Sequence, residues 1–476
     1  MLDGIKRAHF IGLGGIGMSA LARLMILKGY RVSGSDITLN ENLKGMRESG
    51  AEIFCSHAAQ NVAGSDLVVV SSAIRVDNPE LAAARRNNIP VLHRSELLRE
   101  LAKGRTGIAV AGMHGKTTTT NLITHVFKYA GFSPSYVVGG IPREEGLNAA
   151  WGRDNYFIYE ADESDGSLVN YSPSYSIITN IEEEHIGYFD SIDSILVVFR
   201  KFIDNHVRKD RIYCCIDSPH LAGLINERPG DFKTYSVDKP AMIHPTQIEQ
   251  QGAATRFGVM HNGRVLGEVT LNIPGIHNVS NALPVIALAT DVGIPFDMVQ
   301  GGLATFQGTM RRMELLASVN GVSVYDDYAH HPTEIMATLA ALKKMTKGRV
   351  IAVFQPHRYS RLMHLFPRFV DAFGAADTLM LTDVYGAGEE RIDRASSKEL
   401  YRVMCEKGIR NVEYVRDRQG IMNRLIDHIL ADDAVVFMGA GDITKTAAEF
   451  ASVLRKGTAH AEKCSPRADT IHMTGD

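Results

Sequence analysis

Two glycine-rich segments of the chain have residue types and spacings that could hold phosphate groups. GLGGIG, with Gly12, Gly14, Gly15 and Gly17, lies between an apolar predicted strand and a predicted helix. GMHGKT, residues 112–117, follows another such strand and opens another predicted helix. Backbone amides at a helix N-terminus attract phosphate oxygens. The sequence therefore predicts two separate nucleotide sites in one polypeptide.

The second segment has the side chains needed to bind a nucleoside triphosphate. The ammonium of Lys116 would contact the β and γ phosphates, and the hydroxyl of Thr117 would bind Mg²⁺. Only Met113 and His114 separate the two glycines, whereas the usual loop has four residues there. The short loop argues against the large GTPase and motor families. A glycine-rich turn with a chance lysine is the structural alternative.

Acidic side chains and a histidine follow two later predicted strands, in EADESD (160–165) and NIEEEH (180–185). Because the carboxyl ends of parallel strands meet at one edge of a sheet, we expect Glu160 and His185 to lie near the second loop. Glu160 is the leading candidate ligand of Mg²⁺. Since Mg²⁺ prefers oxygen, the residues alone favour His185 as a hydrogen-bonding neighbour of the metal site.

The first segment specifies a diphosphate attached to a ribose. Asp36 ends the next predicted strand, close to the ~20-residue offset at which an acid meets a ribose. A nicotinamide or flavin dinucleotide fits this pattern, and so does a nucleotide sugar; tight strand–helix packing is the structural alternative. Ser71, Ser72 and His93 would touch the nucleotide or merely end their strands.

Three blocks of alternating strands and helices must position these residues, which predicts an α/β fold in three domains. Residues 1–103 and 313–456 are expected to be Rossmann-like. Residues 104–312 are expected to form a P-loop ATPase-type α/β domain with an added antiparallel patch, because Asn262-Gly263 is a favourable hairpin turn. The final segment, 457–476, shows neither the helical nor the strand pattern of apolar residues and is predicted to be disordered.

Composition and charge exclude several other classes of protein. A net charge of −3 over 476 residues gives no electrostatic reason to expect nucleic acid or an anionic membrane as partner. No apolar run approaches the ~18 residues of a membrane span. The N-terminus leaves no room for a signal peptide before HFIGLG, and the five cysteines lack metal spacing. We therefore expect a cytoplasmic protein with reduced thiols.

The chain resembles the Mur ligases, which build the peptide of bacterial cell-wall precursors. The resemblance covers about residues 7–445 and is carried, in order, by GMHGKTTTT, EADESD, TNIEEEH, PGIHNVSNAL, RRME, DDYAHHPTEI, FQPHRYSR and GAGDI. HFIGLGGIGMSALA is most similar to members that act on UDP-N-acetylmuramate and L-alanine. The resemblance implies that the first loop holds the diphosphate of the UDP-sugar and the second holds ATP. It further implies that the sugar's lactoyl carboxylate becomes an acyl phosphate, which the amine of L-alanine attacks.

The loops and the resemblance together give the candidate sites. The expected catalytic residues are Lys116, Glu160, His185, His330 and Arg358, and the expected metal ligands are Thr117, Glu160 and His185. The expected ATP-binding residues are Gly112, Met113, His114, Gly115, Lys116, Thr117, Thr118, His277, Asn278, Asn281, Arg311, Arg312 and Asp326. The UDP-sugar would contact Gly12, Gly14, Gly15, Gly17, Asp36, Ser71, Ser72 and His93, and the amino acid would contact Tyr328, His330, Arg358 and Arg361.

Several alternatives stay open at this point. A recycling ligase that attaches a preformed peptide to the same sugar nucleotide is the close rival; an NAD-dependent oxidoreductase and an inactive scaffold are the distant ones. His330-His331-Pro332 could cap a helix, and Arg358 and Arg361 could be solvated. Ala329 replaces the family's glycine, which leaves selectivity among alanine, glycine and serine open. The oligomeric state is also open. The segment near 312–315 is expected to act as a hinge.

Overall fold

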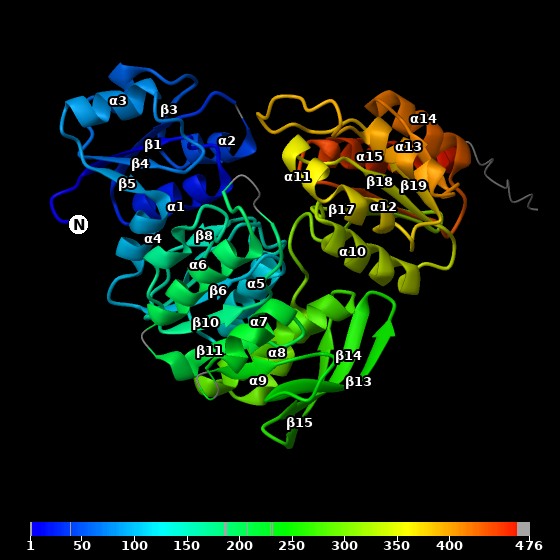
Figure 1. The fold of residues 1–476 in the computed structure, drawn as a ribbon, viewed down its shortest axis with the longest axis horizontal. Helices are drawn as coiled ribbons and strands as arrows, with labels where there is room; N and C mark the ends of the chain where they lie inside the picture. Colours follow the sequence, from blue (N-terminus) through cyan, green and yellow to red (C-terminus); the bar gives the residue numbers. More distant parts are fainter. Residues whose placement is uncertain are drawn as a thin grey trace, which may run out of the picture. The chain divides into compact units, whose positions relative to one another are not determined.

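The computed structural model describes residues 2–38, 40–184, 188–206, 208–228, 230 and 232–463. The chain forms two compact units, Met1–Met310 and Arg311–Asp476 (Figure 1). The second unit thus begins two residues before the domain boundary that the sequence predicts. None of the helices in the described ranges combines the length and the apolar character that a membrane span needs.

The N-terminal part of the first unit, up to residue 103, contains a five-stranded parallel sheet of order β3-β2-β1-β4-β5. Its strands are β1 Arg7–Ile11, β2 Arg31–Ser35, β3 Glu52–Phe54, β4 Leu67–Val70 and β5 Val91–His93, with helices α1 Ile16–Leu27, α2 Glu41–Glu48, α3 Pro79–Arg86 and α4 Arg94–Ala102 and the short helix η1 Ala59–Val62. The strand order reverses at β1, and ligands bind at such switch points in open α/β sheets. The GLGGIG loop follows β1 and therefore lies at this point.

The middle part of the first unit, from residue 104, contains a ten-stranded sheet of order β15-β14-β13-β12-β11-β10-β6-β9-β7-β8. Its strands are β6 Thr106–Ala111, β7 Ser135–Val137, β8 Ala149–Ala150, β9 Tyr156–Glu160, β10 Tyr175–Ile178, β11 Ile212–Cys215, β12 Lys233–Tyr235, β13 Ile243–Gln251, β14 Ala254–His261 and β15 Arg264–Leu271. The helices are α5 Lys116–Tyr129, η2 Ser167–Asn170, α6 Ile192–Asp204, η3 Lys209–Arg211, α7 Pro219–Asn226, α8 Ile276–Asp291 and α9 Phe296–Thr305.

The antiparallel patch is confirmed in β13–β15, the green hairpins of Figure 1. Asn262 and Gly263 join β14 to β15 with φ values of +50° and +72°, as a two-residue hairpin turn of the primed type requires. β6 lies between β9 and β10 and runs parallel to both. The apolar residues of β6 from Ile108 to Ala111 are buried. β6 is thus a central strand. The second glycine loop follows its carboxyl end and therefore lies near the middle of that edge of the sheet.

The second unit contains a six-stranded sheet of order β16-β17-β21-β18-β19-β20, in which only the β16–β17 pair is antiparallel. The strands are β16 Glu314–Val319, β17 Val322–Asp327, β18 Val350–Phe354, β19 Thr378–Leu381, β20 Val412–Tyr414 and β21 Ala434–Met438. The helices are α10 Pro332–Met345, α11 Tyr359–His364, α12 Phe366–Asp371, α13 Ser397–Glu406, α14 Arg418–His428 and α15 Ile443–Lys463. The predicted α/β class holds for both units.

Helix α15 corrects one expectation about the C-terminus. The sequence predicts disorder from residue 457, but the helix continues to Lys463. α15 packs on β16, β17 and β21, and once a helix is nucleated each further residue adds a hydrogen bond. The alanine, glutamate and lysine residues of 459–463 favour such an extension. Residues 464–476 lie outside the described part of the chain.

Candidate active site

The turn from β6 to α5 has the backbone geometry of a phosphate-binding loop. Gly112 and Gly115 have φ values of +124° and +83°. A Cβ atom at Gly112 would collide with Thr179 Oγ1, and one at Gly115 would collide with Asn281 Oδ1. Both positions therefore require glycine, for backbone conformation and for space. Thr117 and Thr118 follow in the first turn of α5 and are buried.

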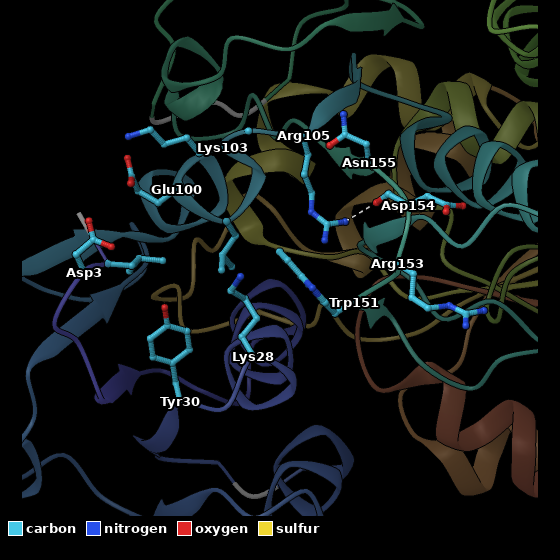
Figure 2. A pocket seen from close by; sticks show the side chains of 13 residues that line it. Asp3, Lys28, Tyr30, Glu100, Lys103, Arg105, Trp151, Arg153, Asp154 and Asn155 are labelled. Carbon is cyan, nitrogen blue, oxygen red and sulfur yellow. Dashed lines mark hydrogen bonds between the residues drawn. The ribbon is translucent and has the colours of Figure 1, made fainter.

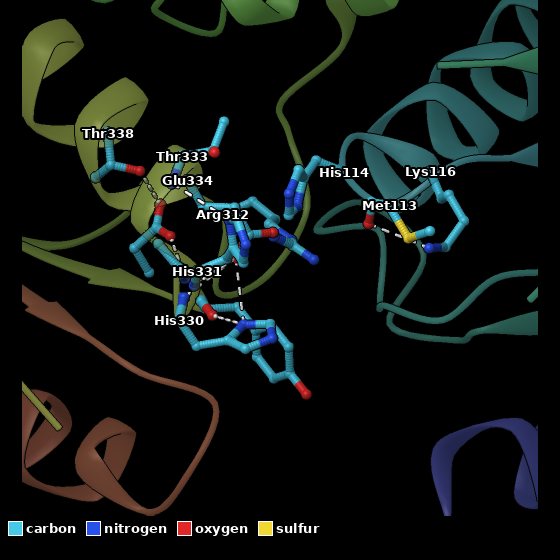
Figure 3. Close-up of polar contacts among 12 residues, drawn as sticks. Met113, His114, Lys116, Arg312, His330, His331, Thr333, Glu334 and Thr338 are labelled. Carbon is cyan, nitrogen blue, oxygen red and sulfur yellow. Dashed lines mark hydrogen bonds and ion pairs between the residues drawn. The ribbon is translucent and has the colours of Figure 1, made fainter. Parts of the chain in front are cut away.

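Lys116 lies against the loop that it follows. Its Nζ donates to the carbonyl oxygens of Gly112 (2.5 Å) and Met113 (3.2 Å), and Figure 3 shows the side chain curled back toward Met113. It also donates to Glu163 Oε1 at 2.8 Å, and Glu163 is completely buried. Burial disfavours the ammonium form, but the charges of Glu163, Asp162 and Glu160 outweigh it and raise the pKa of Lys116. The lysine is therefore held as a cation beside the loop.

Two residues directly after β10, Thr179 and Asn180, position the loop, although no role for them is predicted from the sequence. Asn180 Oδ1 accepts hydrogen bonds from the amides of Met113 (3.1 Å) and His114 (2.9 Å). Asn180 Nδ2 (3.0 Å) and Thr179 Oγ1 (2.6 Å) both donate to the carbonyl of His114. The signal available in the sequence was polar residues directly after a buried strand.

Glu160 lies at the carboxyl end of β9, where it pairs with Val110 of β6. Its Oε1 accepts a hydrogen bond of 2.7 Å from the amide of Gly139. Glu160 at the end of β9 and Thr117 in the first turn of α5 both offer oxygen atoms, which is the donor chemistry that Mg²⁺ prefers. The donor chemistry of these two residues suits Mg²⁺, and their role as metal ligands stays a prediction; His185 lies outside the described residues.

The start of α8, which the sequence predicts to contact ATP, lies against the 112–117 loop. Asn281 lies directly against Gly115. Its Nδ2 donates to Asn278 Oδ1 at 3.1 Å, and Asn278 Nδ2 donates to the carbonyl of Pro274 at 2.7 Å. His277 lies in the first turn of the same helix. The two asparagines thus form a buried polar edge beside the loop.

The GLGGIG loop is held by side chains that follow β2. Asp36 Oδ2 accepts from the amide of Gly14 at 2.9 Å. The Nδ2 atoms of Asn40 and Asn42 each donate to the carbonyl of Gly14 at 3.0 Å. Asp36, which the sequence predicts to meet a ribose, thus also fixes the loop. The two asparagines were not identified from the sequence.

Ser72 and His93 come together, in a network that reaches the middle part of the chain. Ser72 Oγ donates to Asp165 Oδ2 at 2.5 Å and lies 3.0 Å from His93 Nε2. Arg94 Nη2 donates to Asp162 Oδ2 (2.7 Å) and Asp165 Oδ2 (2.9 Å). Burial would raise the pKa of Asp165, but its contacts with His93 and Arg94 hold that pKa well below its ordinary value. The segment that carries Glu160 and Glu163 is thereby tied to the first sheet, whereas Ser71 makes no contact in this network.

In the second unit, the residues predicted to hold the amino acid follow β17 and β18, which both flank β21. The His330 ring centroid lies 5.3 Å from that of Tyr328 and 5.9 Å from that of His357. Arg361 Nη1 donates to the carbonyl of His357 at 3.1 Å. Arg358 has a φ of +68°, and its amide donates to the Tyr385 carbonyl at 2.8 Å. The structure therefore brings Tyr328, His330, Arg358 and Arg361 into one neighbourhood.

His357 and Tyr385 also belong to this neighbourhood, although neither is a candidate site residue from the sequence. Their rings stack with centroids 5.7 Å apart and an interplanar angle of 11°. Burial, followed by the charges of His330 and the neighbouring arginines, lowers the pKa of His357 to about 3. A neutral imidazole at this position can accept a hydrogen bond from Arg361, whose Nη1 lies 3.1 Å from its Nδ1.

The helix-cap alternative is confirmed for His331. His331 is the N-cap of α10, where its side chain accepts from the amide of Thr333 and Glu334 completes a capping box. His330 lies outside the cap: its Nδ1 is 3.2 Å from Glu334 Oε2 (Figure 3) and 2.9 Å from the carbonyl of Tyr328. Adjacent histidines thus have different structural roles.

Three of the expected ATP-binding residues lie near the carboxyl end of β17. Arg311 and Arg312 lie beside the ring of Tyr328, and Asp326 belongs to the strand itself. The guanidinium carbons of Arg311 and Arg312 are 4.9 and 5.1 Å from the Tyr328 ring centroid. Arg311 Nη2 donates to the carbonyl of Gly439 at 2.7 Å. Asp326 accepts from Thr444 Oγ1 at 2.5 Å, and burial raises the pKa of Asp326. Basic and acidic groups therefore converge on the carboxyl ends of β17 and β21.

Comparison with known proteins places these features in a family. Three family models match the chain in order: the Mur ligase family, catalytic domain, over residues 7–106, the Mur ligase middle domain over 110–289, and the Mur ligase, glutamate ligase domain over 311–441. The UDP-N-acetylmuramate–L-alanine ligase of Geotalea daltonii is 41% identical over 456 residues, which cover 96% of this chain and 100% of that protein. The enzyme of the same name from Aquifex aeolicus is 38% identical over 447 residues, which cover 94% and 97%.

Solved structures give the same result. The UDP-N-acetylmuramate-alanine ligase of Thermotoga maritima matches with a TM-score of 0.82 and 30% identity, over 95% of this chain and 99% of that chain. The murein peptide ligase of Psychrobacter arcticus matches with a TM-score of 0.69 and 25% identity, again over 95% and 99%. The chain therefore belongs to the Mur ligase family.

Proposed function

We propose that this protein joins L-alanine to the lactoyl carboxylate of UDP-N-acetylmuramate, with ATP converted to ADP and phosphate, in the synthesis of peptidoglycan precursors. The observation that carries the proposal is the presence of two glycine loops at the carboxyl ends of strands, only one of which has a P-loop lysine. The relatives from Geotalea daltonii, Aquifex aeolicus and Thermotoga maritima, which are named for this substrate pair, support it. ATP and a nucleotide sugar as substrates would place the reaction in the bacterial cytoplasm.

The first step would activate an otherwise unreactive carboxylate. An amine cannot displace oxide from a carboxylate at neutral pH, so the acid attacks the γ-phosphate of ATP and an acyl phosphate forms with loss of ADP. Amides of the 112–117 loop and the ammonium of Lys116 would stabilise the charge on the transferred phosphoryl group. Thr117 and Glu160 would hold Mg²⁺, which supplies further neutralising charge when bound. Amides of the 12–17 loop would bind the diphosphate of the sugar nucleotide.

The second step would deliver the amine of L-alanine to the acyl phosphate, with release of phosphate. Arg358 and Arg361 would hold the alanine carboxylate, because a guanidinium matches a carboxylate with two parallel hydrogen bonds. Burial raises the pKa of Asp327 to about 6, so this carboxyl group would titrate close to neutral pH. Much of the catalysis would come from holding three substrates in a reactive arrangement.

The recycling ligase remains the rival within the family. The Psychrobacter arcticus murein peptide ligase matches with a lower TM-score and a lower identity than the Thermotoga maritima alanine ligase does, which favours the alanine ligase. A dinucleotide oxidoreductase would account for the first loop alone. It leaves Lys116, Glu160 and the arginine-rich neighbourhood in the second unit without a role.

The test is an ADP-release assay with UDP-N-acetylmuramate, Mg²⁺ and ATP, in which the amine substrate is varied. We expect release with L-alanine and little with a preformed tripeptide, and none above background when the sugar nucleotide is omitted. A preference for tripeptide would reject the proposal in favour of recycling. The variant Lys116→Ala should lose activity, and an unchanged rate would reject the assigned ATP loop.

A further inference from the structure

A cavity of about 660 Å³ lies where the N-terminal and middle parts of the first unit meet (Figure 2). Its volume is in the range of roughly 300–1,000 Å³ that is typical of small-molecule sites. Lys28 and Tyr30 line it just before β2, Arg105 just before β6, and Asn155 just before β9. The cavity therefore lies at the amino ends of these strands, whereas the two glycine loops follow the carboxyl ends of β1 and β6.

Trp151 lies between two cations in this cavity. Lys28 Nζ is 4.0 Å and Arg105 Cζ is 4.1 Å from the centroid of the indole ring. Figure 2 shows the indole nearly edge-on, with the two cationic groups on opposite sides. Arg105 is fixed in place, because its Nη1 donates to the Asp154 carbonyl at 2.7 Å and to Ser135 Oγ at 2.9 Å. The guanidinium of Arg105 is thus already held in place on its side of the cavity.

Four cationic side chains line the cavity, and three acidic residues line it as well. Within the described part of the chain, Lys28, Lys103, Arg105 and Arg153 line the cavity without an ion pair to an acidic side chain. Partial burial, followed by the charge of Arg105, lowers the pKa of Lys28. Asp3, Glu100 and Asp154 also line the cavity, but the Asp154 carboxylate accepts from the amide of Ser133. An anion would therefore relieve the repulsion between Lys28 and Arg105.

We propose that this cavity binds a small, multiply charged anion that carries phosphate or carboxylate groups. Its oxygens would accept hydrogen bonds from Lys28 and Arg105 beside Trp151. The bound anion would connect the end of α1 with the segment Lys103–Arg105, which joins the two parts of the unit, and with the segment that follows β8. The site is distinct from both glycine loops and does not depend on the proposed function.

The chain provides its own reporter, because Trp151 is its single tryptophan. The intact protein is titrated with pyrophosphate while tryptophan fluorescence is recorded, and sodium chloride at matched ionic strength corrects for screening. We expect a saturable change in wild type. In Lys28→Gln the apparent Kd should rise roughly tenfold, the factor expected for the loss of one charged hydrogen bond. The exposed control Arg86→Gln should titrate like wild type.

Two further arms identify the site and the ligand chemistry. Lys116→Met, shown by circular dichroism to be folded, should respond to pyrophosphate like wild type, and loss of the response in the folded variant would place binding at the ATP loop and overturn the proposal. A flat titration, a change reproduced by sodium chloride, or an unaltered Kd in a folded Lys28→Gln would overturn it as well. Citrate replaces pyrophosphate in the last arm: saturation by citrate would assign a polyanion site, and saturation by pyrophosphate alone would assign a phosphate site.

Discussion

The ammonium of Lys116 lies 2.8 Å from the carboxylate of Glu163, which is completely buried. The pair joins the P-loop to the segment that follows Glu160. A charged group removed from water is costly unless it is paired, so removal of one partner of a buried pair is strongly destabilising. Under the proposed function, the same ammonium would also serve the phosphate oxygens of ATP. The lysine therefore has both a structural and a catalytic requirement.

Glu163→Ala should lower the free energy of unfolding by about 3–5 kcal/mol, because it leaves the largely buried Lys116 charge without the carboxylate that pairs with it. The double variant Lys116→Met/Glu163→Leu removes both charges and fills the space with apolar atoms. It should recover much of the lost stability and remain without ADP release. Urea unfolding followed by circular dichroism measures both effects. A double variant as unstable as Glu163→Ala would show that the pair is not the cause.

Asn180→Ala should weaken the use of ATP. Asn180 fixes the amides of Met113 and His114 and the carbonyl of His114, so its loss leaves the loop less ordered. We expect kcat/KM for ATP to fall by about 10–100-fold, with a smaller change in kcat/KM for L-alanine. Steady-state assays with each substrate varied in turn measure this. Asn87→Ala, at the exposed position directly after α3, is the control and should behave like wild type.

Arg94→Lys should reduce activity although the positive charge is kept. Arg94 contacts Asp162 and Asp165, and an ammonium does not reproduce the fork of a guanidinium. Since this contact ties the Glu160–Glu163 segment to the first sheet, kcat/KM should fall for ATP and for UDP-N-acetylmuramate together. Kinetics with each nucleotide varied measures this. An effect on one nucleotide alone would contradict the role as a link between the two sites.

Glu80 gives a prediction for acid stability. Burial would raise the pKa of Glu80, but the contact with the His9 ring, whose Nε2 lies 3.6 Å from Oε2, and hydrogen bonds from Ser35 and Asn61 lower it from its ordinary value of 4.5 to about 2. A lowered pKa stabilises the fold above pH 4.5, and this contribution is lost as the pH falls from 4.5 toward 2. The shift corresponds to about 3 kcal/mol.

Glu80→Gln should therefore be destabilised by about 3 kcal/mol at pH 7 and approach wild type near pH 2. Amide hydrogen exchange of peptides from β1 and β2 in the intact protein reports the stability of this sheet. The exposed residue Glu48 provides a matched control, and Glu48→Gln should exchange like wild type at both pH values. A constant difference between Glu80→Gln and wild type across this range would reject the assigned pKa shift.

The sequence by itself determined the features that depend on short segments. The β6–loop–α5 turn follows from an apolar strand, two glycines and a helix start within a few residues. The hairpin at Asn262-Gly263 and the α/β class follow in the same way, because turn chemistry and hydrophobic period are local properties. Glu160 could be placed at the sheet edge for the same reason, since it directly follows a predicted strand.

Only the tertiary structure decided which distant segments meet. The pairing of Lys116 with Glu163, the contacts of Arg94 with Asp162 and Asp165, and the stacking of His357 on Tyr385 each join residues from segments that are far apart in the sequence. Strand order and helix packing fix such contacts, and one sequence carries no local signal for them. The cavity around Trp151 has the same origin, because Lys28, Arg105 and Trp151 come from three segments that meet only once both sheets have formed.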